Sequence, residues 1–450
     1  MKSTKILPGL LYILIVFFYI DVWHNANTTS RLLPVKTLVE SNTWQIDTYH
    51  EQTIDKALIN GHYYSDKAPL PVLITVPFYW LAFHSGISNY FIDGGLYIIG
   101  SVIIGILPFL LISCLMYRRH QQNNFNSQLS MAYTMLLMLS TFIFIYAGTA
   151  FSHLLAAYFL LLAYISLKEK KRYLLTGFFS GAAMLCEFPL GITLILWPVF
   201  ILLQTRKITN SIHFILGSLP FLIALFIYNF YFTGSPFDML YNHEALDNYN
   251  ASGTIIGFSI PSFTNMFLLL LSPFRGLFLY AIPCLLVLII WGKSMKFNFK
   301  NILTYIYNSA AAWYCIATVL LLSSHLVWYG GWSFGPRHLI PLCLLLLYKM
   351  PFYLKYFPEY VKWFLSVTFI GLLLTFSAKV TLLYSINADF KNPIFELILP
   401  AIQNASFNEN NLLTLIFGLN STLAALVFLT ISTVLLIWLL FTRQAVRNNI

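Results

Sequence analysis

The chain has 450 residues, of which 58% are hydrophobic and only 9% are charged, and its mean hydropathy is +0.74. Soluble domains carry about a quarter charged residues, so this composition excludes a water-soluble globular protein. A formal net charge of +10 is compatible with nucleic-acid binding, but the positions of the basic residues favour a different explanation.

Apolar runs of about twenty residues recur along the chain, long enough to cross a ~30 Å hydrocarbon core as helices. The first follows Lys2 and Lys5 without a small-residue cleavage site, so we interpret it as an uncleaved span rather than a signal peptide. Residues 70–83 are short and interrupted by proline, and we expect an interfacial helix there. The sequence thus predicts an all-α polytopic membrane protein with about twelve transmembrane helices, near residues 6–23, 94–117, 130–147, 151–167, 173–187, 189–204, 211–232, 274–292, 303–327, 338–350, 361–378 and 412–440.

The charge distribution predicts how these spans are oriented. With both termini in the cytoplasm, the inner segments hold most of the 26 Lys and Arg residues. Of the 16 acidic residues, they hold only Glu169 and Glu359. This is the positive-inside pattern, so the basic excess indicates orientation rather than a nucleic-acid partner. The inner loops are short, contain no glycine-rich phosphate loop and leave no room for a nucleotide-binding domain.

Polar length is concentrated on the outer side of a single integral-membrane domain spanning residues 1–450. Three long outer loops are expected, at residues 24–93, 233–273 and 379–411, and the first is expected to carry interfacial helices. The five cysteines lie in or beside apolar runs, so we expect no disulfide framework.

The first outer loop holds several candidate proton acceptors. Asp47, Asp55 and Asp66 lie in it, and the sequence YYSDKAP predicts a tight turn that presents Asp66 and Lys67 at the membrane surface. A carboxylate placed there can take a proton from an incoming hydroxyl or amine. The four-residue spacing of Asp47, Glu51 and Asp55 also fits a solvated helix lying on the membrane.

Two later segments add basic residues at the outer face. In LSPFRGLFLY, Arg275 begins a span, where an arginine either extends to the interface or holds an anion. In WYGGWSFGPRHLIPL, the glycines permit a compact turn that aims Arg337 and His338 outward. Trp328 and Trp332 form either an interfacial aromatic belt or a stacking surface for a sugar.

Two further polar residues lie at the outer ends of predicted helices. His153 opens the fourth span, where a capping or core histidine is the alternative interpretation. Glu187 precedes Pro189 and either closes a turn or lines a cavity.

Three motifs, GHYYSDKAPL, SPFRGL and GGWSFGPRHLIP, together with the topology, resemble those of the GT-C glycosyltransferases, which include protein O-mannosyltransferases and lipid A aminoarabinose transferases. The resemblance implies transfer of a sugar, with inversion, from a polyprenyl-phosphate carrier to an acceptor on the non-cytoplasmic side. Such enzymes usually take their base from an acid early in the first outer loop. Here Asn27, Thr28, Thr29 and Ser30 occupy the positions before Arg31, and His153 stands where a second acid is often found. We therefore place the catalytic base at Asp47, then at Asp66 and Asp55.

The remaining site predictions follow from charge and position. We expect donor-phosphate contacts from Lys67, Arg275, Arg337 and His338. Other substrate contacts are expected from Arg31, His62, Tyr63, Tyr64, His153, Glu187, Trp328 and Trp332. No cofactor is predicted. The carboxylates near His50 and His62 could bind a divalent metal, but their spacing follows no recognised ligand pattern.

The expected partners are a polyprenyl-phosphate-linked sugar, a glycan, lipid or protein acceptor, and the bilayer of a bacterial cytoplasmic membrane. A transporter or flippase of a lipid-linked substrate is the first alternative. It would normally show inverted repeats or charged mid-membrane helices, which we do not find in the sequence. A polysaccharide polymerase or ligase is the second, and it would place the functional loop late in the chain.

Overall fold

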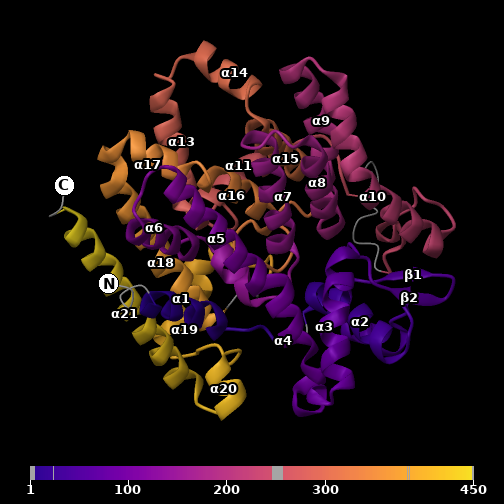
Figure 1. Cartoon of the computed structure of the whole chain (residues 1–450). Coiled ribbons are helices and arrows are strands. Elements are labelled where there is room, and N and C mark those ends of the chain that lie inside the picture. The colour runs from indigo at the N-terminus through magenta and orange to yellow at the C-terminus, as the bar shows by residue number, and fades with distance from the viewer. Residues whose placement is uncertain (1–5, 24, 246–256, 383, 385, 448–450) are drawn as a thin grey trace.

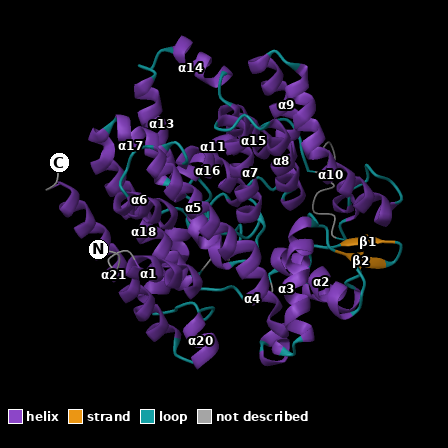
Figure 2. Cartoon of the chain, in the orientation of Figure 1, coloured by secondary structure: helices purple, strands orange, loops and turns teal. Residues whose placement is uncertain are grey.

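The structure is a computed structural model that describes residues 6–23, 25–245, 257–382, 384 and 386–447. The described chain is mostly helical, with one short pair of strands (Figure 2). This is what an apolar chain requires in lipid, where a helix satisfies its own backbone polar groups. The elements, in chain order, are α1 (Ile6–Phe18), α2 (Ala26–Glu40), β1 (Ala57–Ile59), β2 (His62–Tyr64), α3 (Leu70–His84), α4 (Leu96–Gly100), α5 (Leu107–Gln122), α6 (Ser127–Leu139), α7 (His153–Lys168), α8 (Tyr173–Cys186), α9 (Ile192–Thr205), α10 (Ile208–Thr233), α11 (Phe263–Leu271), α12 (Leu277–Tyr280), α13 (Ile282–Ser294), α14 (Phe299–Tyr307), α15 (Ala310–Ser323), α16 (Ile340–Leu347), α17 (Met350–Tyr356), α18 (Val361–Thr381), α19 (Leu399–Gln403), α20 (Leu412–Phe417) and α21 (Ser421–Arg447).

Among the described residues, six helical segments are long and apolar enough to cross a membrane, and the number reaches eight if each of two bent pairs is one span. The predicted count of twelve is not confirmed. Helices α1, α7, α8 and α15 are apolar but have only 13, 16, 14 and 14 residues. At ~1.5 Å per residue each covers less than the ~30 Å core. The protein is therefore an all-α multi-pass membrane protein with six to eight candidate spans. The six single segments are Asp93–Gln122, Phe188–Thr205, Ile208–Thr233, Arg337–Tyr356, Pro358–Thr381 and Ser421–Leu439.

The run predicted as one span at 130–147 is bent. Helix α6 and the 3₁₀ helix η6 (Phe142–Gly148) meet at 83°. Between them Thr141 has extended backbone angles, and every residue of η6 is buried. The bend carries Tyr146 toward the segment after α15, where its hydroxyl donates to the carbonyl of Phe334 at 3.0 Å. The bend thus connects η6 to the loop that supplies Arg337.

The segment predicted as the first outer loop, residues 24–93, folds into α2, a β-hairpin and α3, which lie together on one side of the molecule (Figure 1). The hairpin pairs Ala57 with Tyr64 and Ile59 with His62. Its turn is Asn60-Gly61, with φ of +53° and +83°, which suits the twist of a two-residue hairpin loop. Helix α3 occupies the stretch expected to be interfacial.

The second outer loop extends this small sheet by a single bridge. Glu244 pairs with Ala57, and the Ala245 N–H donates to the carbonyl of Lys56 at 2.8 Å. The two longest polar regions of the described chain are therefore joined next to the turn that carries Asp66 and Lys67.

The first and last helices, α1 and α21, lie side by side (Figure 1). At the end of α1, Phe18 and the following Tyr19 pack against Phe428, with ring centroids 5.2 and 5.1 Å from that of Phe428. The packing fixes the point where the chain leaves α1 and enters the first outer loop.

Candidate active site

Charged side chains from distant parts of the sequence meet where the first outer loop approaches α7, α8 and the start of α16. We call this group the polar cluster. Its members are Arg31, Asp55, Asp66, Lys67, His153, Glu187, Arg337 and His338.

Lys67 lies between two carboxylates. Its Nζ is 2.7 Å from Oδ2 of Asp55 and 2.7 Å from Oδ2 of Asp66. The other oxygen of Asp66 accepts a hydrogen bond from the Ser30 hydroxyl at 3.1 Å. Burial alone would raise the pKa of Asp55, but the Lys67 ammonium outweighs burial and holds this pKa below its usual value. Burial would lower the pKa of Lys67, yet its carboxylate partners raise that pKa above the usual range. Lys67 and Asp55 are therefore charged at neutral pH.

Arg31, on α2, is almost completely buried, with 2% of its side chain exposed. Its Nη2 lies 3.4 Å from Oε1 of Glu187 and donates to Oδ1 of Asn27 at 3.3 Å. Its Nε and Nη1 are buried without a hydrogen-bond partner in the described part of the chain. A buried guanidinium with unused donors is poised to bind an anion.

Glu187 joins several members of the cluster. It lies in the extended residue between α8 and the following 3₁₀ helix, where Pro189 prevents continuation of α8. Besides Arg31, its Oε1 accepts from the Ser152 hydroxyl and lies 3.3 Å from Nδ1 of His153. The break between the two helices thus points a carboxylate at the N-terminus of α7.

The segment WYGGWSFGPRH supplies Arg337 and His338. The His338 ring meets the His153 ring edge-on, with centroids 4.9 Å apart, and the Arg337 guanidinium lies 4.8 Å from the Phe151 ring centroid. Gly330 has a φ of +77°, and a Cβ at this position would lie only 3.0 Å from His338 Cδ2. The turn therefore requires glycine both for its backbone and for its contact with the histidine.

Arg275 is completely buried, and its two terminal nitrogens are occupied by backbone carbonyls, whereas its Nε has no partner in the described part of the chain. Its Nη2 donates to Ile386 O at 2.9 Å and to Gly331 O at 3.4 Å, and its Nη1 donates to Phe274 O at 3.2 Å. The predicted donor-phosphate contact of Arg275 stays a prediction. The observed bonds hold the glycine turn against the segment that follows α18.

Asp47 lies outside the polar cluster, with 39% of its side chain exposed. Its carboxylate is 2.7 Å from His62 Nδ1 and accepts from the Tyr63 N–H at 2.6 Å. Burial acts against these contacts, but the hydrogen bonds from Tyr63 and His62 prevail and lower the pKa of Asp47. The charges of His62 and His50 contribute to the same lowering of its pKa. The predicted roles of Asp47 and His62 therefore stay separate from the buried cluster.

The aromatic residues predicted to contact the substrate are dispersed. Tyr63 stacks on His50 with centroids 4.0 Å apart, and Tyr64 packs on Phe232. Trp328 packs against Phe274, whereas Trp332 is 61% exposed. These residues do not form one continuous surface in the described structure.

Two acidic residues near the cluster were missed in the sequence. Asp21 is buried, and its Oδ2 accepts from the Tyr384 hydroxyl at 2.5 Å. Glu244 lies beside Asp66, and burial together with that carboxylate raises the pKa of Glu244 to about 8. No motif surrounds Glu244, whereas Asp21 could have been noticed as an acid at the end of the first apolar run.

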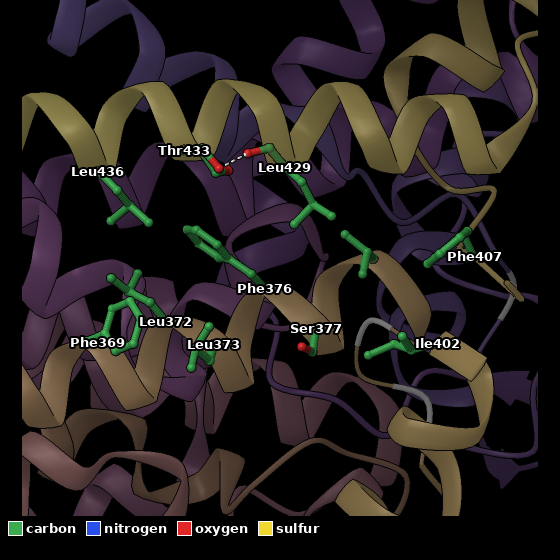
Figure 3. Close-up of a pocket in the computed structure, with 12 residues that line it drawn as sticks. Phe369, Leu372, Leu373, Phe376, Ser377, Ile402, Phe407, Leu429, Thr433 and Leu436 are labelled. Carbon is green, nitrogen blue, oxygen red and sulfur yellow. Dashed lines mark hydrogen bonds between the residues drawn. The ribbon is translucent and has the colours of Figure 1, made fainter. Parts of the chain in front are cut away.

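Two cavities lie between helices, and neither is lined by the polar cluster. One, of about 260 Å³, is bounded mainly by α18 and α21 (Figure 3). The other, of about 570 Å³, lies between the second half of α3 and residues 91–103. Its lining is almost entirely aliphatic and aromatic, which suits a hydrocarbon chain.

The chain matches the crystal structure of ArnT from Cupriavidus metallidurans bound to undecaprenyl phosphate, with a TM-score of 0.51 and 15% identity. The match covers 99% of this chain and 77% of that protein. The fold is ArnT-like. The apo form of the same protein matches with a TM-score of 0.48 and 14% identity, over 98% of this chain and 76% of that one. No protein-family model and no curated protein sequence matches the chain.

The match to ArnT confirms the predicted resemblance at the level of the fold. Within this fold, the chain brings Asp55, Asp66, Lys67, Arg337 and His338 together, all of which were named from the sequence. It also brings together Arg31, His153 and Glu187, which were expected only as general substrate contacts.

Proposed function

We propose that the protein is a glycosyltransferase that moves a sugar from a polyprenyl-phosphate carrier to an acceptor on the non-cytoplasmic side of the membrane. The observation that carries the proposal is Arg31, whose buried guanidinium has two nitrogens without partners in the described chain. The ArnT-like fold supports a lipid-linked donor, because ArnT was crystallised with undecaprenyl phosphate.

The carrier phosphate is proposed to bind Arg31 and Arg337. Both side chains have buried N–H groups that lack partners among the described residues. Charge-assisted hydrogen bonds from them would stabilise the negative charge that develops on the phosphate as the glycosidic bond breaks. Lys67 and His338 flank this position, and Arg275 is proposed to hold the turn that carries Arg337.

The catalytic base is proposed to be Asp55. Its side chain is 25% exposed and that of Asp66 is fully buried, so an acceptor hydroxyl reaches Asp55 more easily. In the inverting reaction, Asp55 takes the proton of the acceptor as its oxygen attacks the anomeric carbon. The bond from that carbon to the phosphate oxygen breaks, and polyprenyl phosphate leaves with both electrons. Asp47 is the second candidate for the base.

The polyprenyl chain is proposed to lie in the 570 Å³ cavity beside α3. Helix α3 begins at Leu70, three residues after Lys67. A carrier whose phosphate lies at the cluster can therefore extend along this helix into an apolar cleft.

The test uses purified protein in liposomes with a panel of radiolabelled polyprenyl-phosphate sugars, scoring the release of polyprenyl phosphate. Loss of the phosphate contact in Arg31→Gln should reduce transfer by roughly 100-fold or more, the magnitude of losing one transition-state donor. Lys36→Gln, on the same helix but outside the cluster, should retain activity. If no donor turns over while labelled lipid moves between leaflets, the protein is a flippase instead.

The base is tested in the same assay. Asp55→Asn should reduce transfer by roughly 10²- to 10⁴-fold, the usual contribution of a general base. Asp47→Asn should change it only a few-fold. If these two results are reversed, Asp47 is the base.

A further inference from the structure

Three side chains at one side of the cluster have the arrangement of a metal site. One nitrogen from His153, one from His338 and one oxygen from Glu187 all lie within 4.8 Å of one another. His153 is buried, and its Nδ1 is 3.3 Å from Oε1 of Glu187. We propose that His153, Glu187 and His338 bind a divalent transition-metal ion.

The donor set selects the class of ion. Two imidazole nitrogens and one carboxylate oxygen occur in catalytic zinc sites that keep a position open for water or substrate. The same set also binds other first-row metals, whereas Mg²⁺ and Ca²⁺ prefer oxygen ligands. The candidates are therefore Zn²⁺ and similar ions such as Co²⁺, Mn²⁺ or Fe²⁺.

A second observation points to a missing ligand. His153 Nε2 is buried and has no hydrogen-bond partner in the described part of the chain. If the neutral His153 ring carries its proton on Nδ1, which faces Glu187, then Nε2 is a hydrogen-bond acceptor and no donor reaches it in the described part of the chain. A metal ion held between the two histidines would satisfy this nitrogen, with a Glu187 oxygen as the third ligand.

The neighbouring cationic side chains repel a divalent ion and therefore lower the affinity of the proposed site for it. Arg31 already lies 3.4 Å from Oε1 of Glu187, and the charges of Arg337, Arg31 and Lys67 all reach His153. A divalent ion must therefore compete with Arg31 for the carboxylate. Removing the Arg31 charge should tighten metal binding, whereas removing any ligand should weaken it.

The decisive experiment is a titration of the purified, metal-free protein in lipid nanodiscs with Co²⁺, followed by visible absorption, and then displacement of Co²⁺ by Zn²⁺. One ion per chain is expected. Each of the variants His153→Gln, His338→Gln and Glu187→Gln should weaken Co²⁺ binding by roughly 10- to 100-fold or more. Loss of a residue that only supports a metal ligand already weakens binding by this factor. Arg31→Gln should bind Co²⁺ more tightly than the wild type.

The matched control is His120→Gln. His120 is also fully buried, and its Nε2 likewise lacks a partner in the described part of the chain. Its Nδ1 contacts the Met116 carbonyl and the Thr134 hydroxyl, and among the described residues it belongs to no group of three metal-binding side chains. This variant should keep wild-type affinity. X-ray absorption of the Co²⁺-loaded wild type should show two imidazole ligands, a readout that does not depend on whether any variant folds.

Absence of one-to-one binding, or equal affinity in all three ligand variants and the wild type, would overturn the metal site. The proposed transferase function is tested separately, since Arg31→Gln is expected to lose transfer and yet gain metal affinity. Metal binding without turnover of any donor would support the site and count against the transferase.

Discussion

At the residue scale, Lys67 balances two carboxylates that would otherwise face each other inside the protein. Replacing it in Lys67→Met leaves Asp55 and Asp66 without their shared cation, and breaking a buried pair in this way costs about 3–5 kcal/mol. We expect a clear drop in the thermal unfolding midpoint at pH 7.5. Lys56→Met removes a partly exposed lysine from the neighbouring hairpin and should cost no more than about 1 kcal/mol. An equal drop of the unfolding midpoint in the two variants would show that the ion pairs of Lys67 add no special stability.

The ion pair between Asp55 and Lys67 also predicts how the stability of the protein depends on pH. The stability contributed by Asp55 is fully present above its unfolded pKa of about 4 and is lost as pH falls through its lower folded pKa. The contribution of Lys67 is present below about pH 10.4 and is lost as pH rises through its higher folded pKa. In Lys67→Met the carboxylates instead become easier to protonate. The difference in midpoint between wild type and variant should therefore shrink from pH 7.5 to pH 5.

Glu244 predicts the opposite trend. Its folded pKa of about 8 exceeds the usual value of about 4.3, because burial and Asp66 favour the protonated form. The wild type should therefore lose stability as pH rises from about 4.3 to about 8. Glu244→Gln cannot ionise and should unfold at the wild-type temperature at pH 5 but at a higher temperature at pH 8.5. A variant that is less stable at pH 8.5 would mean that the carboxylate has a favourable partner.

At the element scale, the glycine turn before α16 can be tested with two alanine substitutions. Gly335 and Gly331 have φ of +66° and +65°, so alanine at either costs about 1–2 kcal/mol in backbone strain. At Gly335 the added Cβ would also lie 3.1 Å from Tyr280 Cβ, whereas at Gly331 the nearest atom is 4.0 Å away. Gly335→Ala should therefore lower the unfolding midpoint more than Gly331→Ala. It should also reduce transfer more, because the turn positions Arg337.

The positions of the helices could be predicted from the sequence better than their shapes. Apolar runs located α10 and α18 to within a few residues, because lipid requires such runs to be helical. The bend after α6 could not be predicted, since apolar residues continue on both sides of it. It depends on a distant partner: the Thr375 hydroxyl, on α18, donates to the Leu139 carbonyl at 2.7 Å, at the end of α6.

In the candidate site, too, local features could be predicted from the sequence, whereas contacts between distant residues could not. Asp66 and Lys67, and likewise Arg337 and His338, adjoin turn-forming residues, and these local patterns indicated their importance. The ion pair between Arg31 and Glu187 joins positions 156 residues apart, and no local pattern predicts it. Arg275 resembled an anion-binding residue for the same reason, because its carbonyl partners lie far along the chain.

At the scale of the whole molecule, the orientation in the membrane can be measured directly. In a chain whose five cysteines are replaced, Glu51→Cys lies in the first outer loop and Lys300→Cys at the start of α14. If both termini are cytoplasmic, an impermeant maleimide added to intact cells should label position 51 at once. Position 300 should react only after permeabilisation. The reverse pattern would place the polar cluster on the cytoplasmic side.

The ion pair between Arg31 and Glu187 also has a consequence for biosynthesis. The two residues are separated by 156 positions. At about 5–20 residues per second, roughly 10 to 30 s pass between their synthesis. During that interval Arg31 lacks its Glu187 partner, and the charge of Asp66, water or a lipid headgroup must compensate it. The ribosome then adds Arg337 and His338 last, so the nascent protein is inserted through most of its length before the cluster is complete.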